Sequence, residues 1–445
     1  MEKEQYIVAL EIGSSKIIGA VATLNPRGGL SVIGLEEEKV VDCVRYGCIQ
    51  NVEETNTRIN RIIKKLENRE SIYPRKIKGV FVGIGGRSLR SVITEVERAL
   101  NGETPITERI IEDIKRESIS VPISGFDILD SVPRRYIIDK VEAKSPVGMI
   151  GSHISAKLSL IVAKPQIKAN IKRVLEERLQ LAVKGFLVTP ICTAEEVLTS
   201  DERQLGCVLI DFGAETTTIS IYKNNTLLYL STLPLGSRNI TRDLTSLSLV
   251  EEKAEDIKKT IGTAMLVDGE ASRLNVEGVN AGEVTNYIVA RAEEIVANIN
   301  AQISYAEITP DNVPGGIILI GGGAKLNGFT TLLEQQTKIK VRRGTISDTI
   351  NVLDRKITVS DYPQIISILA KGATIIKPND DCCEMPPDVP QLHRQESVDV
   401  KKEVKPQQPK TPGTFRKLID KLKVSAEGMF AEDKDGDDDE NDNDK

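Results

Sequence analysis

Two acidic residues stand at matching positions in two short segments about 200 residues apart. Glu11 lies at the end of an apolar run and is followed by Gly13, and Asp211 lies at the end of another and is followed by Gly213. In both segments a short polar turn and a second apolar run follow, which is the pattern of a β-hairpin. Such carboxylates suit a hard cation such as Mg²⁺, held largely through water. The pair predicts a metal site between two similar domains that face each other.

The turns that follow the two carboxylates carry donors for phosphate. Glycine lets the backbone approach a ligand closely, and amides, hydroxyls and an ammonium group bind phosphate oxygens. One such hairpin alone is usually an ordinary tight turn, but two in register favour a shared ligand. We therefore expect the turns to grip one polyphosphate from opposite sides, through Gly13, Ser14, Ser15 and Lys16 in the first turn and Gly213, Thr216, Thr217 and Thr218 in the second.

A third segment is rich in glycine. An apolar strand at residues 317–320 runs into Gly321, Gly322 and Gly323, and we expect a helix to start after them. A turn without side chains lets a base or a phosphate lie on the backbone beside a helix N-terminus. The segment is not a Walker A loop, because the Lys-Ser/Thr ending is missing, and it does not fit a GxGxxG fingerprint. Alone it is a weak signal.

In this order and spacing, the two hairpins and the Gly-Gly-Gly-Ala turn resemble the phosphate-1, phosphate-2 and adenosine motifs of the actin-like ATPase superfamily. The resemblance implies an α/β fold with two actin-like, RNase H-type domains around a cleft that binds ATP and Mg²⁺. It also implies that Glu255 and Lys258 hold the ribose and adenine, and that Gly236 lines the nucleotide site. On physical grounds alone, the Glu/Lys-rich stretch at residues 249–262 is a solvated helix face.

Further segments resemble the FtsA family within this superfamily. One is the first hairpin, which carries Glu11 where most of the superfamily has aspartate. Another is residues 132–161, which look like the subdomain inserted in FtsA, and a third is residues 197–203. The resemblance covers residues 5 to about 377. It implies nucleotide-dependent self-polymerisation and a peripheral location on the cytoplasmic face of the inner membrane at the division site. It also implies a tubulin-like partner, FtsZ, whose C-terminal peptide docks around residues 236–300, and later division proteins as further partners.

An amphipathic pattern near the C-terminal end predicts a membrane-targeting helix at residues 411–430. Its apolar positions recur at i, i+3, i+4 and i+7, and cations that attract anionic lipid fill the other positions. The alternative is a helix that docks on the protein's own body or on a partner. The apolar residues are Phe415, Leu418, Ile419 and Leu422, and the cations include Arg416, Lys417 and Lys421.

Composition changes along the chain predict the domain boundaries. Few apolar residues follow position 378, so we expect a flexible linker and, after the amphipathic segment, a disordered acidic tail. The predicted parts are domain I at residues 1–205 with an inserted subdomain at about 84–162, domain II at 206–364 with a small subdomain at about 236–300, a return helix at 365–377, the linker at 378–410 and the tail at 431–445.

Charge and composition exclude several classes of function. The net charge of -6 gives no basic footprint for nucleic acid, and no apolar stretch is long enough for a transmembrane helix. His153 and His393 are the only histidines, which argues against a histidine triad or a histidine-rich metal site. The six cysteines have no metal-ligand spacing and suit a reducing cytosol.

The second hairpin departs from the superfamily pattern. Ala214 and Glu215 stand where glycines are usual, and Glu215 would repel a terminal phosphate unless it points away or helps to hold the metal. No carboxylate or amide directly precedes Pro190, near the start of the expected linking helix, where relatives that hydrolyse ATP orient water. We therefore expect ATP binding with weak or no hydrolysis. The alternatives are an active actin-like or DnaK-like ATPase, as a chaperone or filament motor, and a membrane scaffold that binds no nucleotide.

Overall fold

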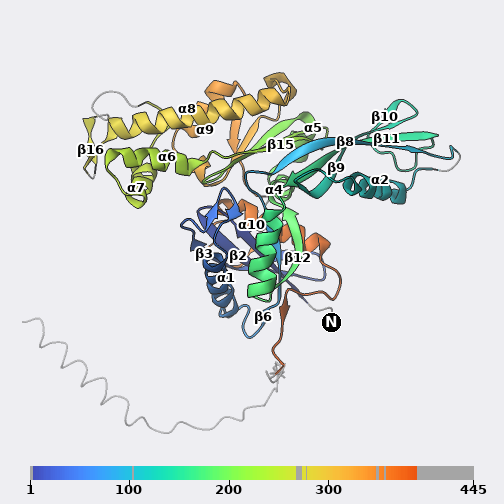
Figure 1. Ribbon diagram of the computed structural model, residues 1–445, viewed down its shortest axis with the longest axis horizontal. Helices are drawn as coiled ribbons and strands as arrows, with labels where there is room; N and C mark the ends of the chain where they lie inside the picture. Colours follow the sequence, from blue (N-terminus) through green and yellow to red (C-terminus); the bar gives the residue numbers. More distant parts are fainter. Residues whose placement is uncertain are drawn as a thin grey trace, which may run out of the picture. The chain divides into compact units, whose positions relative to one another are not determined.

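The computed structural model describes residues 4–102, 105–266, 273–276, 278–346, 350–354 and 357–387. These residues lie in one compact unit. Their longer strands form a six-stranded sheet and a nine-stranded sheet (Figure 1). We call the part built on the first sheet lobe I and the part built on strands β13, β14, β15, β18 and β19 of the second sheet lobe II.

The lobe I sheet combines an antiparallel meander with parallel strands. Its order is β12-β7-β1-β2-β3-β20, with β1, β2 and β3 antiparallel, β7 and β12 parallel to β1, and β20 parallel to β3. The central strands are almost wholly buried, as expected for strands covered on both faces. The strands are β1 (Gln5–Ile12), β2 (Lys16–Leu24), β3 (Leu30–Lys39), β7 (Gly79–Ile84), β12 (Ala182–Val188) and β20 (Asn351–Val352).

Lobe II repeats this arrangement. Its strands follow the order β19-β18-β13-β14-β15, with β13, β14 and β15 antiparallel and with β18 and β19 parallel to β13. The predicted actin-like α/β fold with two similar domains is therefore confirmed. The strands are β13 (Cys207–Phe212), β14 (Thr217–Lys223), β15 (Thr226–Leu233), β18 (Ile317–Ile320) and β19 (Val341–Arg343).

Helices cover both sheets. In lobe I, α1 buries Ile62 and Leu66 against β2, where Gly19 leaves room for them. On the same sheet α10 packs against β1 and against α4. In lobe II, α6, α7, α8 and α9 surround a separate core that includes Phe212 and Phe329, whose rings stack with centroids 4.4 Å apart. The bounds are α1 (Val52–Glu67), α4 (Thr189–Val197), α6 (Ser237–Leu244), α7 (Glu251–Ile261), α8 (Ala281–Tyr305), α9 (Phe329–Thr337) and α10 (Pro363–Ile375).

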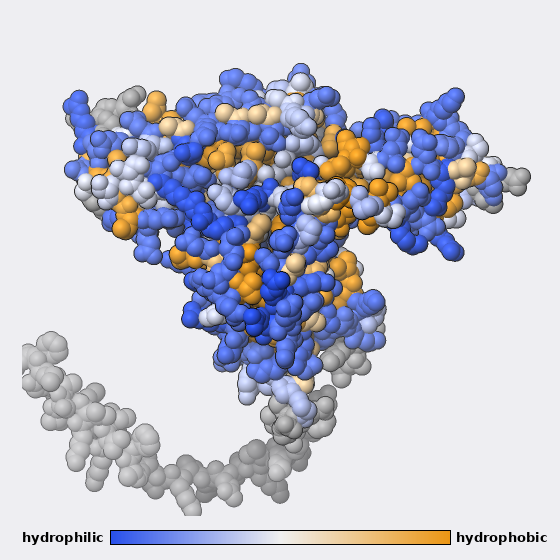
Figure 2. Space-filling view, in the orientation of Figure 1, coloured by the Kyte–Doolittle hydropathy of each residue, from blue (hydrophilic) through white to orange (hydrophobic). Residues whose placement is uncertain are grey.

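An inserted subdomain between β7 and β12 extends the lobe II sheet. Its strand β8 pairs with β15 at Arg90 and Ser231, and Ser91 exchanges hydrogen bonds with Leu230. In sequence the insert thus lies between two strands of lobe I, but its strand β8 is hydrogen-bonded to lobe II. Exposed apolar side chains include Ile93 and Val121, and hydrophobic atoms gather in this part of Figure 2. Its elements are β8 (Arg90–Ala99), α2 (Glu108–Ser120), β9 (Asp127–Ile138), β10 (Val141–Ala143) and β11 (His153–Ala163).

The chain stays packed beyond the predicted start of the linker at residue 378. Strand β21 (Cys383–Glu384) pairs with β6 (Lys76–Ile77), and the Cys382 backbone nitrogen donates to the Tyr6 carbonyl oxygen. The prediction placed the linker start too early because the segment is mostly polar. Its two cysteines, Cys382 and Cys383, are buried and supply the apolar surface that packs against lobe I. Among the described residues, no helix is long and apolar enough to span a bilayer. The predicted helix at 411–430 and the predicted tail lie outside the described residues.

Shorter elements connect these layers. They are β4 (Val44–Arg45), β5 (Cys48–Ile49), α3 (Gln166–Lys172), a π-helical turn (Arg173–Arg178), α5 (Ser200–Leu205), β16 (Asn275–Val276), β17 (Val279–Asn280) and 3₁₀ turns at Thr245–Leu247, Pro310–Asn312, Gly322–Lys325 and Val359–Asp361.

Candidate functional site

The two predicted carboxylates lie at the ends of equivalent strands. Burial raises the pKa of Glu11 to about 7, and the negative charge of Asp211 contributes to the rise. Burial also raises the pKa of Asp211. The Oε2 atom of Glu11 is buried and makes no hydrogen bond, whereas Oδ1 of Asp211 accepts a hydrogen bond of 3.0 Å from Nε2 of Gln364. Two desolvated carboxylates, one with an unpartnered oxygen, suit a cation.

The two hairpin turns have the same backbone geometry. The Gly13 nitrogen donates to the Lys16 carbonyl oxygen at 3.0 Å, and the Gly213 nitrogen donates to the Thr216 carbonyl oxygen at 2.9 Å. An added Cβ would lie 2.9 Å from the acceptor oxygen in the first turn and 3.0 Å from it in the second. Both turns therefore favour glycine for the same steric reason, which is the structural counterpart of the repeat seen in the sequence.

Several predicted phosphate ligands already have protein partners. Nζ of Lys16 lies 2.8 Å from Oε2 of Glu37 and 4.4 Å from the centre of the Tyr362 ring. The Ser14 hydroxyl accepts a hydrogen bond from the Gly47 nitrogen, and the Thr217 hydroxyl donates to the Leu235 carbonyl oxygen. Ser15 is exposed, and Thr216 is half-buried. Lys16, Ser14 and Thr217 thus already contact groups of the protein itself.

Gly236 lies where α6 meets the second turn. A Cβ at this position would lie 2.4 Å from the Ala214 carbonyl group, so only glycine fits without a backbone shift. The Ser237 nitrogen donates to the Gly213 carbonyl oxygen, and the Arg238 nitrogen donates to the Ala214 carbonyl oxygen. The start of α6 is thus hydrogen-bonded to the second turn.

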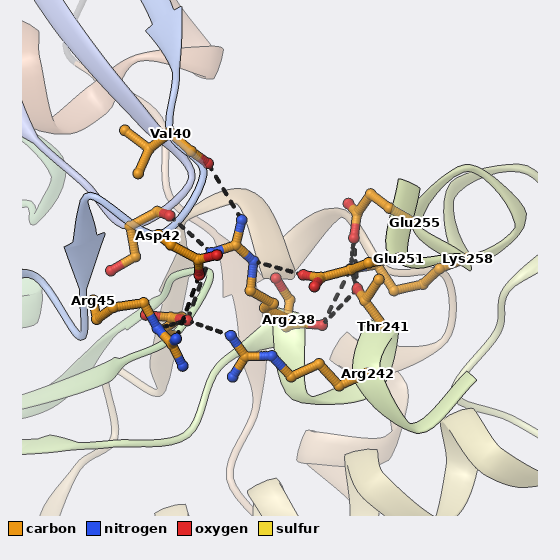
Figure 3. Close-up of polar contacts among 12 residues, drawn as sticks. Val40, Asp42, Arg45, Arg238, Thr241, Arg242, Glu251, Glu255 and Lys258 are labelled. Atoms are coloured by element: carbon orange, nitrogen blue, oxygen red, sulfur yellow. Dashed lines mark hydrogen bonds and ion pairs between the residues drawn. The ribbon is translucent and has the colours of Figure 1, made fainter. Parts of the chain in front are cut away.

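The predicted ribose and adenine residues form a closed network on α7 and α6. Nζ of Lys258 lies 2.6 Å from Oε2 of Glu255, and it also donates to the Thr241 hydroxyl and to the Ser237 carbonyl oxygen. Figure 3 shows Lys258, Glu255 and Thr241 joined by these contacts, and Lys258 is buried. The spacing of three residues on a helix brings the two charges together.

The glycine-rich turn packs against the second carboxylate strand. Gly321 has a φ of +92°, and a Cβ there would lie 2.4 Å from the Phe212 carbonyl oxygen and 2.5 Å from Oδ1 of Asp211. Gly323 lies against the Phe212 ring, whereas Gly322 has open space around its Cα. A 3₁₀ turn follows directly, and α9 begins only at Phe329. The turn therefore brings the end of β18 next to Asp211.

Glu215 points into a cluster of donors that come from both lobes. Its carboxylate accepts hydrogen bonds from Nε of Arg45 at 3.0 Å, the Tyr46 nitrogen at 2.7 Å and Nη2 of Arg242 at 2.8 Å. Arg238 lies within ion-pair distance at 3.5 Å. Burial alone would raise the pKa of Glu215, but the Tyr46 amide and the arginines hold it below the ordinary value. The carboxylate is therefore ionised at neutral pH.

Arg238 is the second link between the lobes. Its guanidinium donates to the Ser14 and Val40 carbonyl oxygens of lobe I and pairs with Glu251 of lobe II (Figure 3). Together, Arg238 and Glu215 hold the first turn against the second. Asp211, Pro190, Thr193 and Thr218 line a narrow recess whose walls leave no room for a ligand. A nucleotide therefore needs space that opens between the lobes.

Sequence reasoning missed Arg45, Arg238, Arg242 and Gln364. Gln364 was detectable as the one amide in the apolar stretch that forms α10, and it reaches Asp211 across 153 positions of the chain. The arginines had no comparable signal, because nothing in their local spacing shows which acid they will meet.

The repeated sheets and paired carboxylate strands define an actin-like protein. Over 82% of this chain and 98% of the other, the fold resembles the solved structure described as "PilM-PilN type IV pilus biogenesis complex", with a TM-score of 0.61 and 16% sequence identity. Residues 208–367 match the family model described as "Cell division protein FtsA", and residues 86–162 match "SHS2 domain inserted in FTSA".

Curated relatives agree with these matches. The chain is 34% identical to the cell division protein FtsA of Porphyromonas gingivalis, over 77% of this chain and 74% of the relative. It is 28% identical to the FtsA of Neisseria meningitidis serogroup B, over 80% and 87% of the two chains. The chain belongs to the FtsA family of cell division proteins.

Proposed function

We propose that this protein binds ATP with Mg²⁺ between its lobes, polymerises, and attaches FtsZ to the cytoplasmic face of the membrane at the division site. The observation that carries the nucleotide part is the pair of matching turns. Each turn follows a carboxylate whose pKa is raised by burial, and Arg238 joins one turn to the other. Because the turns belong to different lobes, a ligand held by both would fix the angle between the lobes.

The residues fit a divalent cation and a polyphosphate. Burial raises the pKa of Glu11 and of Asp211, and the charge of Asp211 raises the pKa of Glu11 further, so a bound cation would stabilise the ionised form of both carboxylates. Mg²⁺ would supply charge neutralisation for the phosphates. Backbone amides of the turns, with Ser15 and Thr216, would hold the phosphates, and Gly321, Gly322 and the pair Glu255 and Lys258 would lie toward the nucleoside.

Weak or absent hydrolysis is part of the proposal. The first turn of α4 is Thr189, Pro190, Ile191 and Cys192, which offers neither a carboxylate nor an amide to orient water. The amide of Gln364 is engaged with Asp211. A bound nucleotide would therefore persist and hold the two lobes together, and this closed form would favour self-association.

Attachment and partner binding rest on surfaces outside the cleft. The segment at residues 411–430 would insert its apolar face into anionic lipid, and several copies in a polymer would make weak attachment firm. The FtsZ peptide would dock on the small subdomain at residues 236–300, where Val250, Leu274 and Tyr287 expose apolar surface. The insert would receive later division proteins.

Nucleotide binding is tested by titrating the purified full chain with ATP and Mg²⁺ in a calorimeter. We expect the Gly213→Asp variant to bind at least about tenfold more weakly, because the new side chain meets the turn and adds charge beside the phosphates. Gly28→Asp adds the same side chain at an exposed turn, where a Cβ meets nothing within 4 Å. Its φ of +83° strains the new residue, so this variant controls for added charge and for local strain outside the cleft. Equal null titrations of wild type and Gly213→Asp would leave a scaffold that binds no nucleotide.

Membrane attachment is tested by flotation with anionic liposomes. The double variant Leu418→Asp and Leu422→Asp should lose most co-flotation, because two charges enter the face that must meet the acyl chains. Asp420→Asn, on the polar face, should retain it. Unchanged flotation of the double variant, or of a chain that lacks residues 411–430, would show that this segment is not the anchor.

A further inference from the structure

The second turn carries a buried carboxylate at the place where the two lobes meet. The side chain of Glu215 is 1% exposed, and its donors come from β4 of lobe I and from α6 of lobe II. The Tyr46 nitrogen adds a backbone donor from lobe I. A carboxylate that joins two lobes in this way is part of the cleft and not an isolated surface ion pair.

The donors around Glu215 are those that bind phosphate in proteins. Guanidinium groups and backbone amides match the oxygens of carboxylates and phosphates equally well, and Arg45, Arg242 and the Tyr46 amide already give their hydrogen bonds to Glu215. The remaining positive charge is also compensated, because Arg238 pairs with Glu251 and Arg45 pairs with Asp42. A further anion at this point would share these donors with Glu215 and would lie close to its negative charge.

We propose that Glu215 stands in for the terminal phosphate of a nucleoside triphosphate, so that the cleft takes a nucleoside diphosphate in preference to a triphosphate. This inference rests on the proposed nucleotide binding and specifies its ligand class. A diphosphate gripped by the two turns leaves the Glu215 contacts intact. A third phosphate adds negative charge next to an ionised, desolvated carboxylate and competes for the same arginines. The triphosphate still binds, at higher concentration.

The selectivity distinguishes this role from a purely structural one. If Glu215 only joined the lobes, its removal would change the affinities for ADP and ATP by the same factor, since both nucleotides bind between the same two lobes. If it replaces a phosphate, its removal frees donors that only the triphosphate can use. Glu215→Gln keeps the size and the packing while it removes the charge, and Glu215→Gly gives the residue that is usual in the superfamily.

The experiment titrates the full chain with ADP and with ATP, each with Mg²⁺, for wild type, Glu215→Gln and Glu215→Gly. We expect wild type to bind ADP at least about tenfold more tightly than ATP. Both variants should lower that ratio at least about tenfold through tighter ATP binding, with ADP affinity changed less. Glu251→Gln is the matched control, because it pairs with the neighbouring Arg238 but its side chain is about half exposed.

Each other outcome has a defined meaning. Equal affinities in wild type, or the same change in both nucleotides for Glu215→Gln, would overturn the inference and leave nucleotide binding in place. If wild type bound neither nucleotide and Glu215→Gly bound both, the carboxylate would exclude nucleotide altogether, and the diphosphate preference would be wrong. Absence of binding in every variant would overturn the nucleotide part of the proposed function, and this inference with it.

Discussion

Replacing Gly321 by alanine is expected to lower the free energy of unfolding by about 2–4 kcal/mol. The residue has a φ of +92°, where an L side chain is strained. The new methyl group would also lie 2.4 Å from the Phe212 carbonyl oxygen and 2.5 Å from Oδ1 of Asp211. These atoms belong to a buried strand that cannot move freely, so the strain spreads into the core of lobe II.

The neighbouring glycine provides the control. A Cβ on Gly322 meets nothing within 4 Å, and no positive φ restricts that position. Urea unfolding of Gly322→Ala should therefore agree with wild type within about 0.5 kcal/mol. Equal midpoints for the two variants would show that the close approach of β18 to Asp211 does not constrain this turn.

The second large effect is a gain in stability when Glu11 loses its charge. At pH 8 and in the presence of a chelator, Glu11→Gln should unfold with a free energy higher by up to about 3 kcal/mol. The reason is burial beside Asp211, which raises the pKa of Glu11 from 4.5 to about 7. The amide keeps the shape of the side chain and removes the charge that the folded protein holds at a disadvantage.

The sign of the pH dependence follows from the raised pKa. Below pH 4.5 the carboxyl is protonated in the folded and the unfolded chain, so it contributes no difference. Between pH 4.5 and about 7 the unfolded chain releases the proton first, and the contribution of Glu11 to stability falls as the pH rises. Above pH 7 the penalty stays constant. The advantage of Glu11→Gln should therefore grow from about zero at pH 4.5 to its full value at pH 8.

Denaturant unfolding at a series of pH values measures this advantage. Glu117→Gln is the matched control, because that side chain is 48% exposed, pairs with Arg98 and lies in the inserted subdomain away from Glu11. It should change stability by less than about 1 kcal/mol at each pH. An advantage of Glu11→Gln that does not change between pH 5 and pH 8 would mean that the carboxylate is not desolvated in the folded protein.

Local patterns carried much of the fold and part of the site. The strands that carry Glu11 and Asp211 and the strand at residues 317–320 were predictable, because runs of apolar residues depend on neighbours in the chain. The repeat of a carboxylate and a glycine showed the two matching turns for the same reason. Glu255 and Lys258 meet because three residues on a helix bring side chains together, whatever surrounds them.

Contacts over long sequence distances were out of reach. The partners of Glu215 include Arg45, which is 170 positions away, and a turn residue can point to either side of its backbone. Gln364 meets Asp211 only because α10 returns to lobe I beside the cleft. The packing of Cys382 against lobe I was hidden in a segment of polar composition. In each case the partner is chosen by the assembled fold.

The sequence by itself determined the two-lobed actin-like fold and the family of the chain, because hairpins, glycine turns and helical periodicity depend on residues that are close together in the chain. Only the tertiary structure decided what the unusual glutamate in the second turn does and how the insert is attached. Glu215 turns toward arginines of both lobes, and β8 joins the lobe II sheet. The physical reason is that charge compensation and strand pairing depend on distances in space, which one-dimensional spacing does not specify.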